Sequence, residues 1–426
     1  MKRIETSVLI IGGGPVGLAA AAELGRFGIP CLLVEQQTTC PELPKMAHVN
    51  VRSREVCRRW GIADKVREAG WPDDHPMDAV FMTSLSGHEI VRFPFPSHAD
   101  RVPRAYSPEA SQRCPQIWFD PLLAEHVRTL PTCGIRFSHR MAAFQASDDH
   151  ITATIENLDN GDESEIIAQY MIAADGPGSM DRQPLGIDRE EWGKGVAQAA
   201  IVLKTPDLNS LHDKAPSAFA YMINSNGLMG LVNPTDGKTL WRLNVALGDQ
   251  PFETFDPHEG VKRLTGFDFD YEIVSVLPWT IRFTIAERYA QGRVFLAGDA
   301  VHTVSPTGGL GMNTGLGDAV DVAWKIAAVL QGWGGPALLA SYDAERRPVG
   351  RAVLTESARN MARFGSIPKE PHVCDDSAEG KAARARVKAA LIEAEAEKEW
   401  ENDGTSLGVA YENSPVIVAN ETLPPE

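Results

Sequence analysis

The run of glycines near the amino terminus has the residue types and spacing that suit phosphate binding. Gly12, Gly14 and Gly17 stand between a short apolar segment and an alanine-rich one, which predicts a turn from a buried strand into a helix. In such a turn the first glycine permits a tight bend, the second lets the backbone approach a pyrophosphate, and the third allows close packing of helix on strand. Pro15 opens the helix, whose unpaired amides can hold phosphates. Glu35 ends the next predicted strand, where its carboxylate can bind a ribose.

A second glycine-rich segment follows another buried strand late in the chain. The first motif alone fits an NAD-binding or an FAD-binding protein, and residues 292–302 with 306–313 decide between them. Asp299 ends the strand, so its carboxylate can accept a hydrogen bond from a ribityl or ribose hydroxyl. The glycines after it bring backbone amides and a helix N-terminus against an aromatic ring system, where the helix dipole stabilises the negative charge of a reduced flavin. The sequence therefore predicts FAD as the cofactor.

Three separated segments resemble those of the class A FAD-dependent aromatic monooxygenases, the family of para-hydroxybenzoate hydroxylase and phenol hydroxylase. They are Gly-Gly-Gly-Pro-Val-Gly at 12–17 with Glu35, Ala-Asp-Gly-x-x-Ser-x-x-Arg at 174–182, and the segment from Gly-Asp-Ala-Val-His to Gly-Met-Asn at 298–313. The resemblance covers about residues 6 to 350 and implies an α/β fold. That fold has a Rossmann-like FAD-binding domain of glutathione-reductase type, an inserted substrate domain with a mixed or antiparallel sheet, and a helical C-terminal segment.

The same resemblance implies which residues contact the cofactor. The ADP half would meet the first glycine turn and Glu35, and Asp299 would bind the ribityl chain. Asp175 and Gly176 resemble a motif that contacts both FAD and the nicotinamide co-substrate. Pro306 would lie beside the flavin ring with its carbonyl near the reacting edge. The full set of expected cofactor-binding residues is Gly12, Gly14, Pro15, Gly17, Glu35, Arg52, Gln116, Asp175, Gly176, Asp299, Pro306, Gly309, Leu310, Gly311, Met312 and Asn313.

Hydroxylation of an aromatic ring sets two further demands on the site. A flavin hydroperoxide delivers an electrophilic oxygen, so a phenol must be made electron-rich by a base or a hydrogen-bond relay, and water must be excluded. His48 lies in a string, residues 47–52, that resembles its counterpart in chlorophenol hydroxylases, although a structural histidine fits equally well. The catalytic candidates are Pro306, His48 and Tyr221. The substrate candidates, for which packing is the alternative role, are His48, Tyr221, Trp241 and Arg242.

These features predict a monooxygenase that hydroxylates a phenolic or related aromatic substrate with FAD, dioxygen, and NADPH or NADH as a transient co-substrate. The same cofactor motifs also fit a flavin epoxidase or a Baeyer-Villiger oxygenase that acts on a polycyclic or polyketide substrate. A non-catalytic FAD-fold binding protein is a more distant alternative. The chain has no Trp-x-Trp-x-Ile-Pro string, which argues against a halogenase. NADH and NADPH are not distinguished, because no separate nicotinamide motif is present.

The elements that must position these residues form interrupted domains. Strand-like pieces alternate with turn signals between residues 186 and 277, which predicts an antiparallel sheet, and the proline-rich stretch 71–108 predicts loops. The tail predicts a charged surface helix over 376–400. We expect an FAD-binding domain of residues 1–75, 105–185 and 278–365, a substrate domain of 76–104 and 186–277, and a C-terminal helix and tail of 366–426 without a thioredoxin-like third domain.

The composition excludes several other classes of partner. A net charge of −16 repels nucleic acid and anionic membranes, so any anionic ligand must be held by local positive groups. The six cysteines include no Cys-x-x-Cys pair, which predicts neither a metal site nor disulfides and fits the cytoplasm. No signal peptide opens the chain, and glycines and a proline interrupt the apolar stretch 8–24, so no membrane span is expected. The expected partners are a small aromatic substrate, dioxygen and NAD(P)H, with a homodimer left open.

Overall fold

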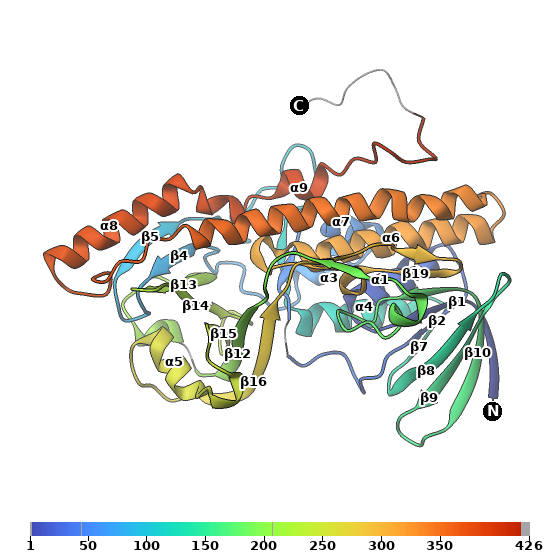
Figure 1. Cartoon of the computed structure of the whole chain (residues 1–426), viewed down its shortest axis with the longest axis horizontal. Helices are drawn as coiled ribbons and strands as arrows, with labels where there is room; N and C mark the ends of the chain where they lie inside the picture. Colours follow the sequence, from blue (N-terminus) through green and yellow to red (C-terminus); the bar gives the residue numbers. More distant parts are fainter. Residues whose placement is uncertain (1, 44, 207, 419–426) are drawn as a thin grey trace.

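Two sheets lie side by side, and the long helices α6 (Leu310–Leu330) and α7 (Pro336–Gly365) run along one side of the molecule (Figure 1). The computed structural model describes residues 2–43, 45–206 and 208–418. The parts of the predicted segments that fall on residues 1, 44, 207 and 419–426 lie outside these ranges. The predicted fold class, an α/β nucleotide-binding sheet with a second sheet and a helical C-terminal segment, is confirmed.

The first sheet has eight strands and a parallel centre. β1 (Lys2–Ile11) lies between β10 and β2, and its residues Val8, Leu9 and Ile10 are fully buried. Such a continuous apolar run is expected where helices cover both faces of a parallel sheet. The strand order is β18 (Ala290–Gln291), β19 (Val294–Leu296), β10 (Glu163–Ala173), β1, β2 (Cys31–Val34) and β7 (Cys133–Arg136), and β9 (Ile151–Asn157) and β8 (His139–Ala146) extend β10 as antiparallel neighbours.

Helices pack beside this first sheet. α1 (Pro15–Arg26) packs against α6 and against α4 (Gln116–Thr129), and Gly28, at a φ of +71°, turns the chain after α1. Two shorter helices, α2 and α3, follow the short strand β3 (His48–Val49). The helices beside the first sheet are α2 (Val51–Arg59), α3 (Ala63–Arg67), α4 (Gln116–Thr129), α6 and α7.

The second sheet has seven strands and is mostly antiparallel. β4 and β5 form one edge of this sheet, and β4 pairs with β13 in parallel. Both strands lie within the proline-rich stretch 71–108, for which the sequence predicted loops. α5 (Pro257–Thr265) covers one face. The strand order is β16 (Glu272–Ile281), β12 (Val196–Lys204), β15 (Leu240–Ala246), β14 (Gly227–Pro234), β13 (Phe219–Asn224), β4 (Ala79–Met82) and β5 (Glu89–Phe93).

The C-terminal segment packs on the other face of this second sheet, and its helix is a surface helix, as predicted, that also buries one apolar stripe. α8 (Ala378–Glu393) lies beside β4 and β5 (Figure 1). It buries Ala383, Val387 and Leu391 in a cluster with residues of β4, β5 and β13. Its charged residues occupy only the remaining faces. Small apolar residues at helical spacing therefore outweigh the high charge of the segment, because one apolar stripe is enough to dock a helix.

Among the residues that the structure describes, no helix is both long and apolar enough to cross a bilayer. Over the same residues, no group of three His, Cys, Asp or Glu side chains is arranged to hold a metal ion.

Several short elements complete the fold. They are β3 (His48–Val49), β6 (Gln112–Arg113), β11 (Arg189–Glu191), β17 (Thr284–Ala286), β20 (His302–Thr303), the 3₁₀ turns η1 (Gln183–Leu185), η2 (Leu208–Leu211), η3 (Phe252–Thr254), η4 (Gly298–Ala300), η5 (Thr307–Gly309) and η6 (Ala396–Glu399), and α9 (Asp403–Leu407).

Candidate functional site

The three glycines of the first turn differ in what surrounds them. A Cβ on Gly12 would lie 2.3 Å from the carbonyl oxygen of Ala174, and one on Gly17 would lie 1.9 Å from that of Gly12. Both positions are therefore needed for packing of the chain on itself. A Cβ on Gly14 would meet no atom of the structure within 4 Å. Gly14 is also the N-cap of α1 and offers no side-chain cap, so open space lies before unpaired helix amides.

Glu35 is fixed beside this turn by two backbone amides. Its Oε2 accepts a hydrogen bond from the Gly13 amide at 2.5 Å, and its Oε1 accepts one from the Gln37 amide at 2.7 Å. The side chain is only half-buried. A carboxylate oxygen has more than one acceptor direction, so Glu35 keeps acceptor capacity toward a ribose hydroxyl.

The two glycine turns meet in space. β1 and β19, which lead into them, both pair with β10 in parallel, so their carboxyl ends reach the same edge of the sheet. A Cβ on Gly298 would lie 2.8 Å from the Val16 side chain, and one on Gly315 would lie 2.6 Å from it. The glycine turn after β1 and the turn after β19 therefore touch at Val16, as binding of one cofactor to both requires.

Asp299 lies within the second turn. Its side chain is accessible to solvent, yet protein surrounds it closely enough that burial raises its pKa, against the opposing effects of His302 and Lys45. An accessible carboxylate is suited to accept hydrogen bonds from a hydroxylated ligand.

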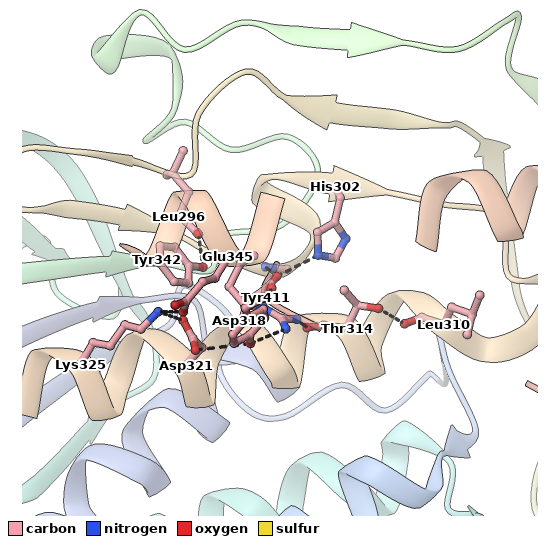
Figure 2. Close-up of polar contacts among 12 residues, drawn as sticks. Leu296, His302, Leu310, Thr314, Asp318, Asp321, Lys325, Tyr342, Glu345 and Tyr411 are labelled. Carbon is pink, nitrogen blue, oxygen red and sulfur yellow. Dashed lines mark hydrogen bonds and ion pairs between the residues drawn. The ribbon is translucent and has the colours of Figure 1, made fainter. Parts of the chain in front are cut away.

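A buried network of charged residues on α6 and α7 supports this second turn from the interior of the protein (Figure 2). Asp318 on α6 accepts hydrogen bonds from the Gly298 amide at 3.2 Å and from His302 Nε2 at 2.8 Å through the same oxygen. Its other oxygen accepts from Arg346 Nε at 2.8 Å. Although burial acts to raise the pKa of Asp318, Arg346 and His302 hold it below its ordinary value. His302 thus supports the turn from the protein side, in line with a structural role.

The network continues along α6 and fastens the C-terminal tail. Lys325 is fully buried and pairs with Asp321 at 2.6 Å and with Glu345 of α7. Glu345 also accepts a hydrogen bond from Ser414 of the tail. Because a buried charge is tolerated only when it is paired, these contacts fix α6, α7 and the tail relative to one another.

We expect Tyr411→Phe to lower the free energy of unfolding by about 1 kcal/mol, the typical net value of a buried hydrogen bond. The Tyr411 hydroxyl accepts from Arg346 at 3.2 Å and lies 3.5 Å from Asp321. Urea unfolding followed by circular dichroism measures the change. The matched control is Tyr271→Phe, which removes an exposed tyrosine hydroxyl that contacts His258 of α5. Equal stability of both variants and wild type would show that the tail is not fastened through this hydroxyl.

The loop that follows the second turn, residues 306–309, is called the flavin-side loop below. Gly308 and Gly309 both have positive φ values, +82° and +62°, and α6 begins directly after them without a side-chain cap. Asn313 on the first turn of α6 donates to the His48 carbonyl at 3.0 Å and accepts from the Asn50 amide at 3.0 Å. Backbone amides at the start of α6 are thereby held in place opposite β3.

His48 lies against the flavin-side loop. A Cβ on Gly309 would fall 3.0 Å from the His48 ring. Burial, followed by the positive charges of Arg101 and Arg113, lowers the pKa of His48 to about 4. The imidazole is therefore neutral at pH 7 and can donate or accept a hydrogen bond, although it cannot act as a cation.

Arg113 is a buried residue beside His48 that the sequence did not single out. Its backbone pairs with that of His48, its guanidinium stacks 4.5 Å from the Trp71 ring and 5.2 Å from the Phe219 ring, and it donates to the Pro234 carbonyl at 2.6 Å. Burial lowers its pKa to about 10, and none of its described contacts is a carboxylate. Arg113 therefore brings positive potential between the two sheets, close to His48.

The substrate candidates on the second sheet fall on opposite faces. Tyr221 lies opposite Leu231, and Arg242 lies opposite Asn233 two positions further along the same strand, so Tyr221 and Arg242 share a face. Trp241 points to the other face, into the core under α5. Trp241 cannot join the others in one site, which corrects its selection as a substrate contact.

Two further candidates from the sequence, Arg52 and Gln116, make polar contacts with other residues of the chain. Arg52 is 65% exposed at its side chain and pairs with Glu55. Gln116 donates to Asp120 at 2.8 Å and accepts from the Lys45 amide at 3.2 Å. The positions of these side chains follow from α2 and α4, and their contacts with a cofactor stay predictions.

The Asp175 segment reaches the second turn. Asp175 accepts from the Asp181 amide at 3.3 Å, and burial raises its pKa. Arg182 of the same segment donates to the Ala300 carbonyl at 2.9 Å. The third motif of the sequence therefore joins the other two at one place in the fold.

These residues fit FAD. The free space at Gly14 suits a pyrophosphate, Glu35 and Asp299 supply carboxylates for hydroxyl groups, and α1 and α6 both begin without a side-chain cap. The fit depends on backbone and carboxylate groups, which is consistent with the strongly acidic composition.

Comparisons with known proteins agree with this arrangement. A sequence family described as FAD binding domain matches residues 5–357. The chain is 34% identical over 365 residues to a putative polyketide hydroxylase of Streptomyces halstedii, covering 83% of this chain and 65% of that protein. It is 30% identical over 378 residues to 2,4-dichlorophenol 6-monooxygenase of Delftia acidovorans, covering 85% and 64%. The chain thus spans just under two thirds of the length of these two relatives.

A solved structure is similar along nearly the whole chain. The rebeccamycin biosynthetic enzyme RebC with reduced flavin superposes with a TM-score of 0.93 at 39% identity, covering 99% of this chain and 80% of that one.

Proposed function

The chain belongs to the family of FAD-dependent aromatic monooxygenases, and from this membership we propose that it hydroxylates a phenolic or related aromatic substrate with NAD(P)H and dioxygen. FAD, the family's cofactor, supplies the activation of dioxygen when it is bound. The observation that carries the proposal is the contact of the two glycine turns at Val16, with free space at Gly14 in the first turn and a solvent-accessible carboxylate, Asp299, in the second.

We assign the cofactor contacts by what each group offers. Gly14 and the start of α1 would hold the pyrophosphate, Glu35 the ribose, and Asp299 the ribityl hydroxyls. The amides at residues 309–313 would meet the ring, with Pro306 beside it. The helix dipole of α6 would then favour negative charge on the reduced ring.

The substrate would lie between the flavin-side loop and the shared face of Tyr221 and Arg242. His48, neutral at pH 7, would hydrogen-bond to the substrate hydroxyl, and Arg242 would favour its ionised form. The Arg242 guanidinium lies 5.8 Å from the centre of the Trp279 ring, so this ring would form an aromatic side of the substrate space. Relatives whose names state single-ring phenols and polyketides as substrates support a range of aromatic sizes.

A positively charged groove is our proposed approach for the nicotinamide co-substrate. The groove has a volume of about 490 Å³, and its lining includes three arginines, Arg182, Arg189 and Arg282, together with Asp188 and Glu191. Arg182 connects it to the Asp299 turn through Ala300. On a protein of net charge −16, such a local positive group is what an anionic pyrophosphate requires.

We expect Arg282→Ala to raise KM for the nicotinamide roughly 10-fold, the effect of losing about 1.4 kcal/mol, with kcat and FAD content nearly unchanged. Arg282 is exposed in the groove, so its removal should not disturb the fold. Steady-state kinetics with NADH and with NADPH measure KM. Arg359→Ala, which removes an exposed arginine of α7, is the control. An unchanged KM for both nucleotides would contradict the proposed groove.

The function itself is tested on the purified protein. It should carry FAD, a suitable phenol should accelerate bleaching of the flavin by NAD(P)H, and the product should gain one oxygen atom from dioxygen. Mass spectrometry with labelled dioxygen separates a hydroxylated ring from an epoxide or an inserted ester oxygen. Flavin that stays oxidised with every nicotinamide and every phenol would reject the enzyme and favour a binding protein.

The domain bounds predicted from the sequence continue as a proposal. We propose that residues 1–75, 105–185 and 278–365 form the FAD-binding domain, that residues 76–104 and 186–277 form the substrate domain, and that residues 366–426 form a C-terminal helix and tail. We also propose a location in the cytoplasm, and a homodimer stays an open prediction.

A further inference from the structure

A short C-terminal stretch inserts between the second sheet and the flavin-side loop. Glu399, the last residue of η6, is 4% exposed. The Tyr221 hydroxyl lies 3.2 Å from each of its carboxylate oxygens, and the Gly308 amide donates to Glu399 Oε1 at 3.3 Å. Asn402 donates to the Gly308 carbonyl at 2.6 Å. One segment therefore contacts both sides of the proposed substrate space.

Aromatic packing fixes the ring of Tyr221 and leaves its hydroxyl as the adjustable group. The ring stacks on Phe81 with centroids 4.9 Å apart and lies 5.0 Å from the Phe364 ring. Trp400, next to Glu399, meets it edge-on at 5.8 Å. With the ring held on three sides, only the direction of the hydroxyl hydrogen can change without repacking.

We propose that Glu399 is a positioning residue, which ties the flavin-side loop to the second sheet through Gly308 and Tyr221. The inference deepens the proposed function, since the loop and the sheet are taken there as the two sides of the reaction space. Glu399 acts through the loop backbone and the tyrosine and is not placed in contact with the substrate.

The protonation state of Glu399 decides which way its hydrogen bonds run. Burial raises its pKa to about 8, against the opposing effects of the Gly308 amide, the Tyr221 hydroxyl and Arg363 on α7. As a neutral acid, Glu399 accepts from Gly308 through Oε1 and donates from Oε2 to Tyr221, whose own hydrogen can then reach another acceptor. As a carboxylate, it accepts from both. Burial also raises the pKa of Tyr221, so the phenol stays protonated in either state.

The first test follows the flavin in the FAD-loaded protein. Because the charge on Glu399 appears next to the flavin-side loop, the visible absorption of the wild type should change with a midpoint near pH 8. Glu399→Gln, which keeps both hydrogen bonds of the neutral acid, should abolish that transition and retain FAD. Tyr221→Phe removes a donor to the carboxylate, so its midpoint should move up by about one pH unit. Glu393→Gln, an exposed change at the end of α8, is the matched control.

The second test needs no flavin, so it separates this inference from the proposed function. An acid whose pKa rises from 4.5 to about 8 on folding binds more protons when folded, so its ionisation destabilises the fold as pH rises between those values. The melting temperature of Glu399→Gln, relative to that of wild type, should therefore increase as pH rises from about 5 to 8. The melting temperature of Glu393→Gln relative to wild type should stay constant over the same range.

Either of two results would overturn the assignment. One is a flavin transition that persists in Glu399→Gln. The other is a pH profile of melting temperature that is parallel in Glu399→Gln and wild type. If Glu399→Gln does not fold, Tyr221→Phe decides alone, because an unshifted midpoint in that variant rejects the link. Failure to bind FAD in the wild type would reject the proposed function, while the melting profiles would still test Glu399.

Discussion

Gly14→Ala should give a folded protein that binds FAD at least about 1000-fold more weakly, a loss of about 4 kcal/mol. The added methyl group meets no protein atom within 4 Å, and Gly14 has an extended backbone with φ −74° that alanine adopts freely. The space it enters is where the pyrophosphate would approach the α1 amides. A rigid backbone turn cannot yield, so the methyl group and a phosphate oxygen would compete for one volume.

The comparison that makes this result specific uses a second helix start. Gly335 is the N-cap of α7, is extended, precedes a proline as Gly14 does, and has free space at its Cβ. Gly335→Ala should leave both melting temperature and FAD affinity unchanged. Gly12→Ala should instead fail to fold, because its φ is +105° and its Cβ would strike Ala174. Fluorescence titration of the apoprotein with FAD measures the affinities, and wild-type affinity in Gly14→Ala would contradict the phosphate site.

The sequence could single out candidate cofactor residues because the signals for them are local. A glycine at a fixed spacing, or a carboxylate at the end of a buried strand, follows from a few neighbouring residues. Assembly of the motifs then follows from topology: Gly12, Asp175 and Asp299 stand after β1, β10 and β19, and three adjacent parallel strands bring their carboxyl ends together. Long-range geometry was thus implied by a rule of sheet construction.

The substrate side could not be predicted in the same way. Glu399 pairs with Tyr221 across 178 residues, and nothing in a tail rich in Glu and Lys distinguishes it from its neighbours. Its burial depends on docking of α8, which the high charge of the segment concealed. Arg113 stands among prolines and cysteines without a repeating pattern, so its stacking on Trp71 emerges only from the fold. Trp241 differs, because it is adjacent to Arg242 on a strand, and alternation alone places the two on opposite faces.

Asp299→Ala should weaken FAD binding roughly 100-fold, since hydrogen bonds to a charged group contribute about 1.5–3 kcal/mol. Its carboxylate lies within a turn that Asp318 holds through the Gly298 amide, so the loss should leave the turn intact. Asp299→Asn keeps an acceptor oxygen and should lose less. Asp148→Asn, on the exposed turn between β8 and β9, is the surface control. Unchanged flavin content in Asp299→Ala would contradict the role of this residue.

The pH dependence of binding gives the Asp299 assignment an independent test. Burial raises its pKa above the ordinary value of 3.8, and hydroxyl donors from a ribityl chain would favour the ionised form. By linkage, FAD binding should then release a proton at pH values near the raised pKa, and the affinity of the wild type should fall as pH falls through that pKa. Asp299→Asn cannot ionise, so its lower affinity should be flatter over the same range. A wild-type profile parallel to that of Asp299→Asn would mean that the ligand's hydroxyl groups bind elsewhere.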